Sequence, residues 1–386
     1  MSMFRYLTAG ESHGQSLVAI TEGMVAGLPL DEAYICSDLR RRQCGYGRSS
    51  RMRVERDEAK IISGVRFGLT IGSPIGLIIQ NRIWAEWTEI MSIAPSDTRV
   101  DPITCPRPGH ADLPGMTKYK TSDIRPILER ASARETAARV AVGAIARRFL
   151  EEFDISIYSH TVAIGHCRAK VSPNIDWNKV DASALRCADI EIEKAMMAEI
   201  DKAKDAGDTL GGVSEIIATG VPVGLGSHVH WDRRLDGRIA QAVMSIQAVK
   251  GVEIGSGFKL ATSEGSQAHD IIKAIKQQPH PLSRGTNRAG GIEGGITNGQ
   301  PVIVKAAIKP IATLGKPLAS IDLSTGKKAT AHYERSDICV VPSAGVVGEA
   351  MLSIVLADAM LEKFGGDNIK ETLTNFNNYN KSILSR

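Results

Sequence analysis

The sequence predicts a layered α+β fold in which helices are enclosed between β-sheets. Two helical segments are apolar on every side, which is the pattern of a helix buried on all faces. Short β-branched runs such as ISIYSHTVAIG (155–165) and GGVSEIIATGVPVGLG (211–226) lie between the helices, with turn residues at short intervals. No low-complexity linker divides the 386 residues, so we expect a single domain over 1–386 with a peripheral C-terminal tail from about residue 367.

The first buried helix is predicted to follow residue 132. Ser132 and Glu135 form the S-x-x-E pattern of a capping box, in which each side chain accepts a hydrogen bond from a backbone N–H at the helix start. Behind this pattern, apolar residues recur at helical spacing as far as Phe153, and the opposite face is apolar as well. Before this helix, residues 1–125 are predicted to consist mainly of strands and loops.

Three more helices are predicted. The segment EAMLSIVLADAMLEKF (349–364) is apolar all round and ends at Gly365 and Gly366, where a left-handed C-terminal cap forms easily. A helix from about 236 to 248 has one apolar face. The helix from about 190 to 206 alternates charged and apolar residues, so we expect it at the periphery of the molecule.

Composition excludes several classes of protein. The 47 basic and 43 acidic side chains leave a net charge of only +4, which is too weak for general nucleic-acid binding. The six cysteines contain no C-x-x-C pair, so no metal site is expected, and His228 with His230 is interpreted as a structural pair. No stretch approaches the roughly 18 apolar residues of a membrane-spanning helix, and the N-terminus resembles no targeting peptide. We therefore expect a soluble, cytoplasmic protein.

Two glycine-containing motifs near the N-terminus carry chemically active side chains. GESHG places His13 between glycines, which permit close approach of a ligand, although a structural loop histidine is the alternative. RRRQCGYGR belongs to a stretch with seven arginines between Arg40 and Arg56, whose planar guanidinium groups suit phosphate and carboxylate. A solvated basic surface or an RNA-binding patch is the other interpretation, but Tyr46 is the only aromatic residue of this stretch.

Two further motifs place cations beside a rigid loop or a helix start. In PRPGHADL the prolines stiffen the loop, so that His110 is presented in a fixed direction next to Arg107. In ERASARE, Arg130 and Arg134 lie at a predicted helix start, whose free N–H groups favour anions. These residues are candidates for an acid and a phosphate clamp, and surface arginines beside an ordinary helix cap are the alternative.

Two motifs near the C-terminus are less specific. GTNRAGGIEGGITNGQP (285–301) is rich in glycine but lacks the spacing of nucleotide-binding loops, so a set of tight turns explains it equally well. ERSDICVVPSAG places Arg335 beside Asp337, before a predicted apolar strand and the second buried helix. These two side chains are interpreted either as a structural pair or as a clamp and a base.

In combination the motifs resemble those of the chorismate synthase family. Across roughly residues 5–365 the chain carries, in the family's order, GESHG, RRRQCGYGR, RPGHADL, ASARETAARVAVGAIA, GDTLGG, VPVGLG, IQAVKGVEIG, GGIEGGITNGQP, KPIAT and ERSD. The resemblance implies a β-α-β sandwich with central helices enclosed by antiparallel sheets, assembled as a homotetramer. It also implies a reaction, the 1,4-elimination of phosphate from 5-enolpyruvylshikimate 3-phosphate to give chorismate, using reduced FMN (FMNH2) without net redox change.

The resemblance also implies roles for individual residues. His13 is similar to the family's histidine near the departing phosphate, and His110 to the one that protonates the reduced flavin. Asp337 is similar to the carboxylate that relays the proton of flavin N5, with Ser12 as a helper. The arginines that match the family's substrate clamp are Arg42, Arg48, Arg51, Arg107 and Arg134, of which Arg42 and Arg48 also match positions assigned to a nicotinamide cofactor.

The FMN contacts implied by the resemblance are spread over five segments of the chain. They are Arg130, Ala131, Ser132, Gln247, Ala248, Gly294, Lys309, Pro310, Ile311, Ala312, Thr313 and Arg335. Ala131 and Ala312 depart from the residues usual in the family, so we expect their contacts to be made by the backbone. Cys44 stands where glycine or proline is common, and we expect it to make the site more sensitive to oxidation.

The source of reducing equivalents stays open at this stage. The flavin is reduced either by the chain itself with NADPH or by an external flavin reductase, and the lack of an obvious extra domain favours the second. The main alternative function is an NADPH-dependent flavin oxidoreductase, which would consume reductant in proportion to product. An RNA-binding protein would instead lose affinity steeply with salt and need no flavin.

Overall fold

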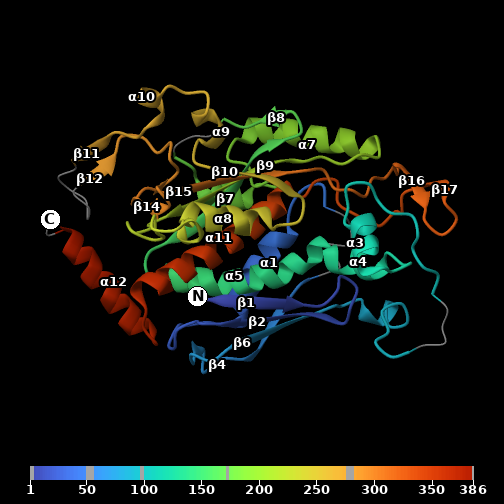
Figure 1. The fold of residues 1–386 in the computed structure, drawn as a ribbon, viewed down its shortest axis with the longest axis horizontal. Helices are drawn as coiled ribbons and strands as arrows, with labels where there is room; N and C mark the ends of the chain where they lie inside the picture. Colours follow the sequence, from blue (N-terminus) through green and yellow to red (C-terminus); the bar gives the residue numbers. More distant parts are fainter. Residues whose placement is uncertain (1–3, 49–55, 96–99, 171–173, 275–281, 385–386) are drawn as a thin grey trace.

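Three layers make up the molecule, as Figure 1 shows: a four-stranded sheet, a middle layer of long helices and a five-stranded sheet. The computed structural model describes residues 4–48, 56–95, 100–170, 174–274 and 282–384. Both sheets are antiparallel and the helices lie between them, which confirms the predicted α+β sandwich.

The first sheet is formed by the N-terminal part of the chain. Its strands have the order β1 (Arg5–Ala9), β2 (Ser16–Glu22), β6 (Ile75–Gln80) and β3 (Ala59–Ser63). In β2 the buried side chains Leu17, Ala19 and Thr21 alternate with less buried ones, which is the pattern of a strand with one face on the core. The buried face of this sheet packs on the helix layer.

The second sheet is built from later segments. Its strands have the order β10 (Val249–Ile254), β15 (Val302–Ile308), β9 (Gly212–Thr219), β7 (Ser156–Ile164) and β8 (Cys167–Arg168). The predicted β-branched runs 155–165 and 211–226 supply β7 and β9, which pair with each other, so this prediction is confirmed.

Four helices fill the middle layer. α1 (Glu32–Gln43) and α5 (Thr136–Glu151) pack on the first sheet, while α8 (Leu235–Met244) and α11 (Val341–Phe364) pack on the second. α5 and α11 also cross each other, and a Cβ added at Gly143 would lie only 2.3 Å from the Cβ of Ala350. This crossing therefore requires glycine. Because other elements cover them on all sides, both helices are apolar all round, as predicted.

α11 differs from its prediction at the N-terminal end. The sequence predicts a helix over 349–364, whereas α11 begins at Val341 and takes in the residues predicted as an apolar strand. Pro342 is accommodated because a first-turn N–H has no helical partner to lose. The expectation that no segment reaches the length and apolarity of a membrane span is also wrong for α11, but 94% of its most apolar window is buried inside the protein.

The predicted capping box is not formed. The hydroxyl of Ser132 accepts from the N–H of Arg134 at 3.3 Å, within the 3₁₀ turn Ala133–Glu135 that precedes α5. The Glu135 carboxylate instead accepts from Nε of Arg139 at 2.9 Å, one turn further along. Because the 3₁₀ turn lies between Ser132 and the start of α5, Ser132 and Glu135 do not flank the first turn of a regular α-helix. The two reciprocal hydrogen bonds of a capping box therefore do not form.

The N-terminal third holds more helix than predicted. α1, α3 (Asp112–Tyr119) and α4 (Arg125–Ala131) all lie in or next to segments predicted as strands and loops. The sequence of α1 is mostly polar, which makes its helical period faint. As a result Arg40–Arg42 lie in the last turn of α1 rather than on a glycine-containing loop, and cations at this end suit the helix dipole.

The other elements surround the sandwich. α7 (Ile190–Asp205) lies over β7 and β8, at the edge of the molecule as predicted, and α12 (Ile369–Leu384) packs on α11 (Figure 1). α8 ends before the predicted 248, because the chain turns into β10 through Ala248, whose φ is +68°. The short elements are α6 (Trp177–Ala182), α9 (Gly257–Leu260), α10 (Gly265–Ala268), and the hairpins β4 (Val65–Arg66) with β5 (Leu69–Thr70), β11 (Ile272–Ala274) with β12 (Leu282–Arg284), β13 (Ile292–Glu293) with β14 (Ile296–Thr297) and β16 (Ala319–Asp322) with β17 (Lys327–Thr330).

Candidate active site

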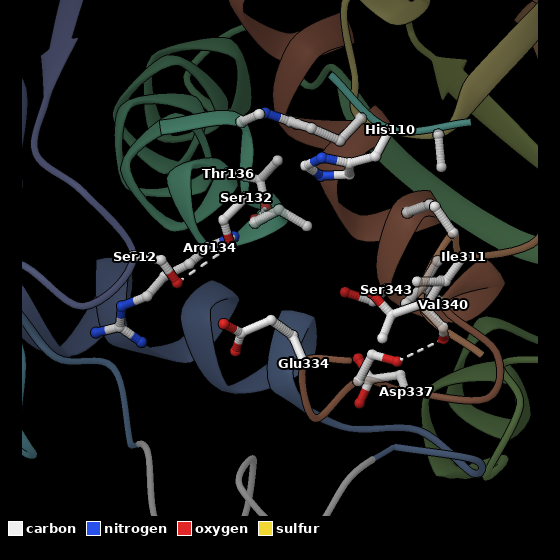
Figure 2. Close-up of a pocket in the computed structure, with 18 of the residues that line it drawn as sticks. Ser12, His110, Ser132, Arg134, Thr136, Ile311, Glu334, Asp337, Val340 and Ser343 are labelled. Carbon is white, nitrogen blue, oxygen red and sulfur yellow. Dashed lines mark hydrogen bonds between the residues drawn. The ribbon is translucent and has the colours of Figure 1, made fainter. Parts of the chain in front are cut away.

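A cavity of about 500 Å³ opens beside the N-terminal ends of α5 and α11. Free backbone N–H groups and the helix dipole make such ends attractive to anions. Figure 2 shows Ser12 and Arg134 on one side of the cavity and His110 and Ile311 on the other. The candidate residues come from segments far apart in the sequence, and folding brings them to this one space.

The lining of the cavity is strongly cationic. Its charged lining residues are Arg42, Arg48, Arg107, Arg134, Lys309 and Arg335, against Glu334 and Asp337. Nearly all of these cations are arginines, whose forked guanidinium groups bind phosphate and carboxylate through two hydrogen bonds. The geometry therefore suits a ligand with several negative charges.

Two of the arginines share one buried carboxylate. Asp57 contacts Nη1 of Arg134 at 3.0 Å and Nη1 of Arg42 at 3.4 Å. Burial lowers the pKa of Arg42 to about 10, and the charges of Arg48 and Arg134 act in the same direction, against that of Asp57. Arg42 stays protonated at neutral pH, but the surplus of positive charge around it favours the arrival of an anion.

Asp337 and Ser12 also lie on the cavity wall. The carboxylate of Asp337 is 2.9 Å from Nη1 of Arg48, while Arg335 is exposed. The Ser12 hydroxyl is 3.1 Å from that of Ser132. Asp337 and Ser12 therefore line the same cavity as the arginines.

His13 is held between a carboxylate and an indole ring. Its Nδ1 lies 2.8 Å from Oε1 of Glu129, and its backbone N–H donates to Oε2 at 2.7 Å. The Trp87 ring stacks on the imidazole, with 3.7 Å between ring centroids and 17° between planes. Burial works against ionisation of Glu129, but hydrogen bonds from His13 hold its pKa below the usual range.

His110 has a similar acidic partner. Its Nδ1 contacts Oδ1 of Asp112, and the other oxygen of that carboxylate accepts from Nε of Arg107 at 2.8 Å. Burial opposes ionisation here too, but the hydrogen bonds from His110 and Arg107 hold the pKa of Asp112 well below its usual range. Nη2 of Arg107 also lies 3.0 Å from Nδ1 and 3.4 Å from Nε2 of the His110 ring.

Most of the predicted flavin contacts line the same cavity. They are Ala131, Ser132, Gln247, Ala248, Lys309, Ile311, Ala312, Thr313 and Arg335. Oε1 of Gln247 is buried with no hydrogen-bond partner, and a donor on a ligand would satisfy it. Ala248 has a left-handed backbone, a strained conformation that occurs preferentially at functional sites.

Three predicted site residues are described by the structure and do not line this wall. Arg130 is exposed and donates to backbone oxygens at the end of β1, because it lies on the far side of α4. Gly294 is in the turn between β13 and β14, and Pro310 is exposed between two lining residues. Arg51 lies outside the described residues.

The acidic and aromatic residues that contact the candidate side chains were not predicted from the sequence. Asp57, Glu129 and Trp87 contact the candidate arginines and His13, and Glu334 pairs with Arg125 at 3.0 Å. Glu129 is the first residue of the motif ERASARE and Glu334 the first of ERSDICVVPSAG, and these positions were the signals available in the sequence. The other contacts join distant segments, so no local pattern announces them. Within the described ranges, no group of three or more His, Cys, Asp or Glu side chains is placed to hold a metal ion.

Comparison with known families decides what this cavity belongs to. Residues 4–361 match the family model described as chorismate synthase. The chain belongs to the chorismate synthase family. The matched region includes every residue that lines the cavity, so the family's enzymatic activity and this cavity belong to the same part of the chain.

Individual members of the family are similar along their whole length. Proteins named chorismate synthase from Streptomyces avermitilis and Moorella thermoacetica are 53% and 55% identical over 397 and 389 residues, covering 99% or more of this chain and 100% of theirs. A crystal structure of a chorismate synthase aligns with a TM-score of 0.80 at 45% identity, covering 99% of both chains. The fold and the family are therefore shown by sequence and by structure.

Proposed function

We propose that this cavity catalyses the 1,4-elimination of phosphate from 5-enolpyruvylshikimate 3-phosphate. The reaction gives chorismate, belongs to the carbon–oxygen lyases and uses reduced FMN without net redox change. The observation that carries the proposal is the convergence of two histidines and four predicted clamp arginines on one cavity, in a chain of the chorismate synthase family.

Electrostatics supports this substrate. One phosphate and two carboxylates, together with the phosphate of FMN, bring about five or six negative charges into one space, which is costly without nearby cations. In the free chain Asp57 and Asp337 already orient Arg42, Arg134 and Arg48. Such preorganised groups need little rearrangement when the anion arrives.

The cavity wall also fits reduced FMN. The unpaired acceptor on Gln247 suits a ring N–H, apolar neighbours such as Ile311 suit the ring face, and Lys309 with Arg335 suits the phosphate. Reduced FMN, when bound, supplies an electron-rich ring that assists the departure of phosphate. The surrounding apolar residues keep water away from the reacting atoms.

We propose that the two histidines and Asp337 transfer protons. His13 is proposed to act beside the departing phosphate, where a general acid lowers the cost of the developing charge. His110 is proposed to protonate the flavin, with Asp112 orienting its ring. Asp337 is proposed as the carboxylate that relays the proton of flavin N5, with Ser12 as a helper.

Assembly and location complete the proposal. We propose a cytoplasmic homotetramer that binds neither nucleic acid nor membrane and receives reduced flavin from an external reductase, with NADPH as the alternative direct reductant. The outer face of the first sheet supports self-association, because Leu7, Ile20 and Ile62 are 73%, 51% and 64% exposed. A contiguous apolar face of this kind is typical of an interface.

An anaerobic assay tests the proposal. With reduced FMN and 5-enolpyruvylshikimate 3-phosphate, the protein should release one phosphate per chorismate while consuming no reductant. His13→Ala and His110→Ala should each slow turnover by about 10²-fold or more, as expected for lost proton donors. No phosphate release from folded, flavin-bound protein would refute the proposal, and reductant consumed in proportion to product would favour the oxidoreductase instead.

A further inference from the structure

We infer that Glu129 is the positioning residue for His13: its carboxylate holds the proton of the imidazole on Nδ1 and leaves Nε2 as the nitrogen that exchanges a proton in the cavity. The inference deepens the proposed function, since it rests on His13 acting as the acid. Glu129 does not line the cavity and acts only through His13.

The contacts tie the histidine to α4 at two points. Glu129 accepts from the His13 ring through Oε1 and from the His13 backbone through Oε2, and its side chain is fully buried. The backbone carbonyl of Glu129 also accepts from the N–H of Ser12 at 3.1 Å. One residue thus fixes both the main chain and the ring orientation of the GESHG loop.

One face of the His13 imidazole ring is also covered. Trp87 stacks on the imidazole, and the guanidinium of Arg125 lies 5.4 Å from the indole centroid while its Nη1 is 3.2 Å from Oε1 of Glu129. Rotation of the ring would break the bond to Glu129 and the stacking on Trp87 together. His13 has no other side-chain hydrogen bond within the described residues, so Nε2 is left for a ligand.

The tautomer follows from the chemistry of the partner. Glu129 is ionised, so both of its oxygens are acceptors and Nδ1 must donate. The charged side chains around His13 are Glu129 and Arg125 on α4, and Glu334 with its partner His332 before α11. Among these, Glu129 makes the closest contact with the ring, and a carboxylate at this distance favours the imidazolium that a general acid needs.

Substitution by glutamine separates position from charge. The amide of Glu129→Gln keeps the volume of the side chain but offers one acceptor and one donor in place of two acceptors. It can satisfy the His13 backbone N–H or the ring Nδ1–H, and not both. Glu129→Asp keeps the charge but shortens the side chain, so it should restore part of what glutamine loses.

A ligand-free measurement tests the pairing. The pH titration of Trp87 fluorescence, taken as the difference between the protein and its Trp87→Phe variant, reports the charge of the stacked imidazole, because an imidazolium quenches an indole more than the neutral ring. The midpoint should move to lower pH by about one unit in Glu129→Gln. His13→Asn should abolish the transition. An unmoved midpoint in Glu129→Gln overturns the inference.

The anaerobic assay tests the positioning role. In Glu129→Gln, kcat should fall about 10- to 100-fold with KM changed less than about threefold, and the pH at which activity falls should move with the fluorescence midpoint. Glu129→Asp should recover part of kcat. Glu215→Gln is the matched control. Oε1 of Glu215 lies 3.0 Å from Nε2 of buried His160, and neither residue lines the cavity. The kcat and the pH profile of this variant should be unchanged.

Three results count against the inference. Unchanged kcat in Glu129→Gln despite a moved midpoint would show that the contact has no role in turnover. An equal loss of kcat in Glu215→Gln would show a general effect of damaged buried pairs. If Glu129→Gln does not fold, Glu129→Asp decides: wild-type kcat with a wild-type midpoint, despite the shortened side chain, would count against the inference. Failure of the wild type to release phosphate would refute the proposed function instead, and fluorescence alone would then decide the pairing.

Discussion

Two clusters of arginine and carboxylate lie side by side in the helix layer, and neighbouring residues of α1 belong to different ones. Arg41 belongs to a core cluster with Arg147 and Arg186 around Glu349. Arg42 belongs to the cavity cluster with Arg134 and Asp57, beside Arg48 and Asp337. Both clusters are buried and built from the same residue types, but only the second opens onto a cavity.

The charges are balanced differently in the two clusters. Glu349 is fully buried and accepts hydrogen bonds from Arg41, Arg186 and the Ser159 hydroxyl. Burial raises its pKa, but the charges of the arginines outweigh this effect and lower the pKa to about 2. Contact with Glu349 raises the pKa of Arg41 against the effect of burial. Arg42, in contrast, has its pKa lowered. The core cluster balances its charges with Asp38 and Asp181, although Nε of Arg41, Arg147 and Arg186 is buried without a hydrogen-bond partner within the described residues. The cavity cluster instead holds positive charge that an anion completes.

The largest effect is expected from breaking the core cluster. Glu349→Gln leaves buried Arg186 and the partly buried Arg41 and Arg147 facing a neutral amide, so the free energy of unfolding should fall by about 3–5 kcal/mol in urea denaturation. Glu362→Gln, which removes a half-exposed partner of Arg233 and Arg238, should cost less than about 1 kcal/mol. Equal losses in the two variants would contradict the distinction between a buried cluster and a surface pair.

Acid should weaken the core cluster next. The pKa of Glu349 is about 2 in the folded chain, against an ordinary value of 4.5 for a glutamate side chain. A depressed folded pKa stabilises the protein above the unfolded value, so this contribution is complete above about pH 5 and is lost as pH falls towards 2. The shift corresponds to about 3 kcal/mol. Urea denaturation at several pH values should show this acid-dependent part in the wild type and not in Glu349→Gln.

The comparison is sharpened by neighbouring substitutions on α1. Arg42→Gln removes a guanidinium from the cavity, so kcat/KM in the anaerobic assay should fall about 10²-fold, or about 2.7 kcal/mol, while the unfolding free energy should fall by less than in Glu349→Gln. Arg41→Gln should show the reverse, with lower stability and near-normal kcat/KM of the folded protein. The same phenotype from both substitutions would mean that the two clusters act as one unit.

The helix layer shows which parts of the fold are visible in a sequence. α5 and α11 are recognisable because enclosure on all sides demands apolar residues all round. α1 is not, because its side chains Arg41 and Arg42 are held by charged partners on distant segments rather than by an apolar stripe. The start of α11 at Val341 was also hidden, since Val, Pro and Gly at its N-terminus are residues of low helix propensity.

The site divides in the same way. His13, His110 and the arginines are identifiable by residue type and by their rigid or glycine-containing surroundings. Their acidic partners are not, because Glu129 is 116 residues from His13 along the chain and Asp57 reaches Arg134 only through the fold. The proline-stiffened loop is the exception, since His110 and Asp112 are both within PRPGHADL and contact each other.

The backbone N–H of Phe4 donates to the carboxylate of Asp358 on α11 at 2.9 Å. This hydrogen bond joins two residues that are 354 positions apart in the sequence. At the usual rate of translation the ribosome needs roughly 20–80 s to make a chain of this length. α11, which packs on the second sheet and crosses α5, leaves the ribosome among the last segments. Until then the faces of β7, β9 and α5 that α11 covers have no partner, so a message truncated before residue 341 yields an incomplete core.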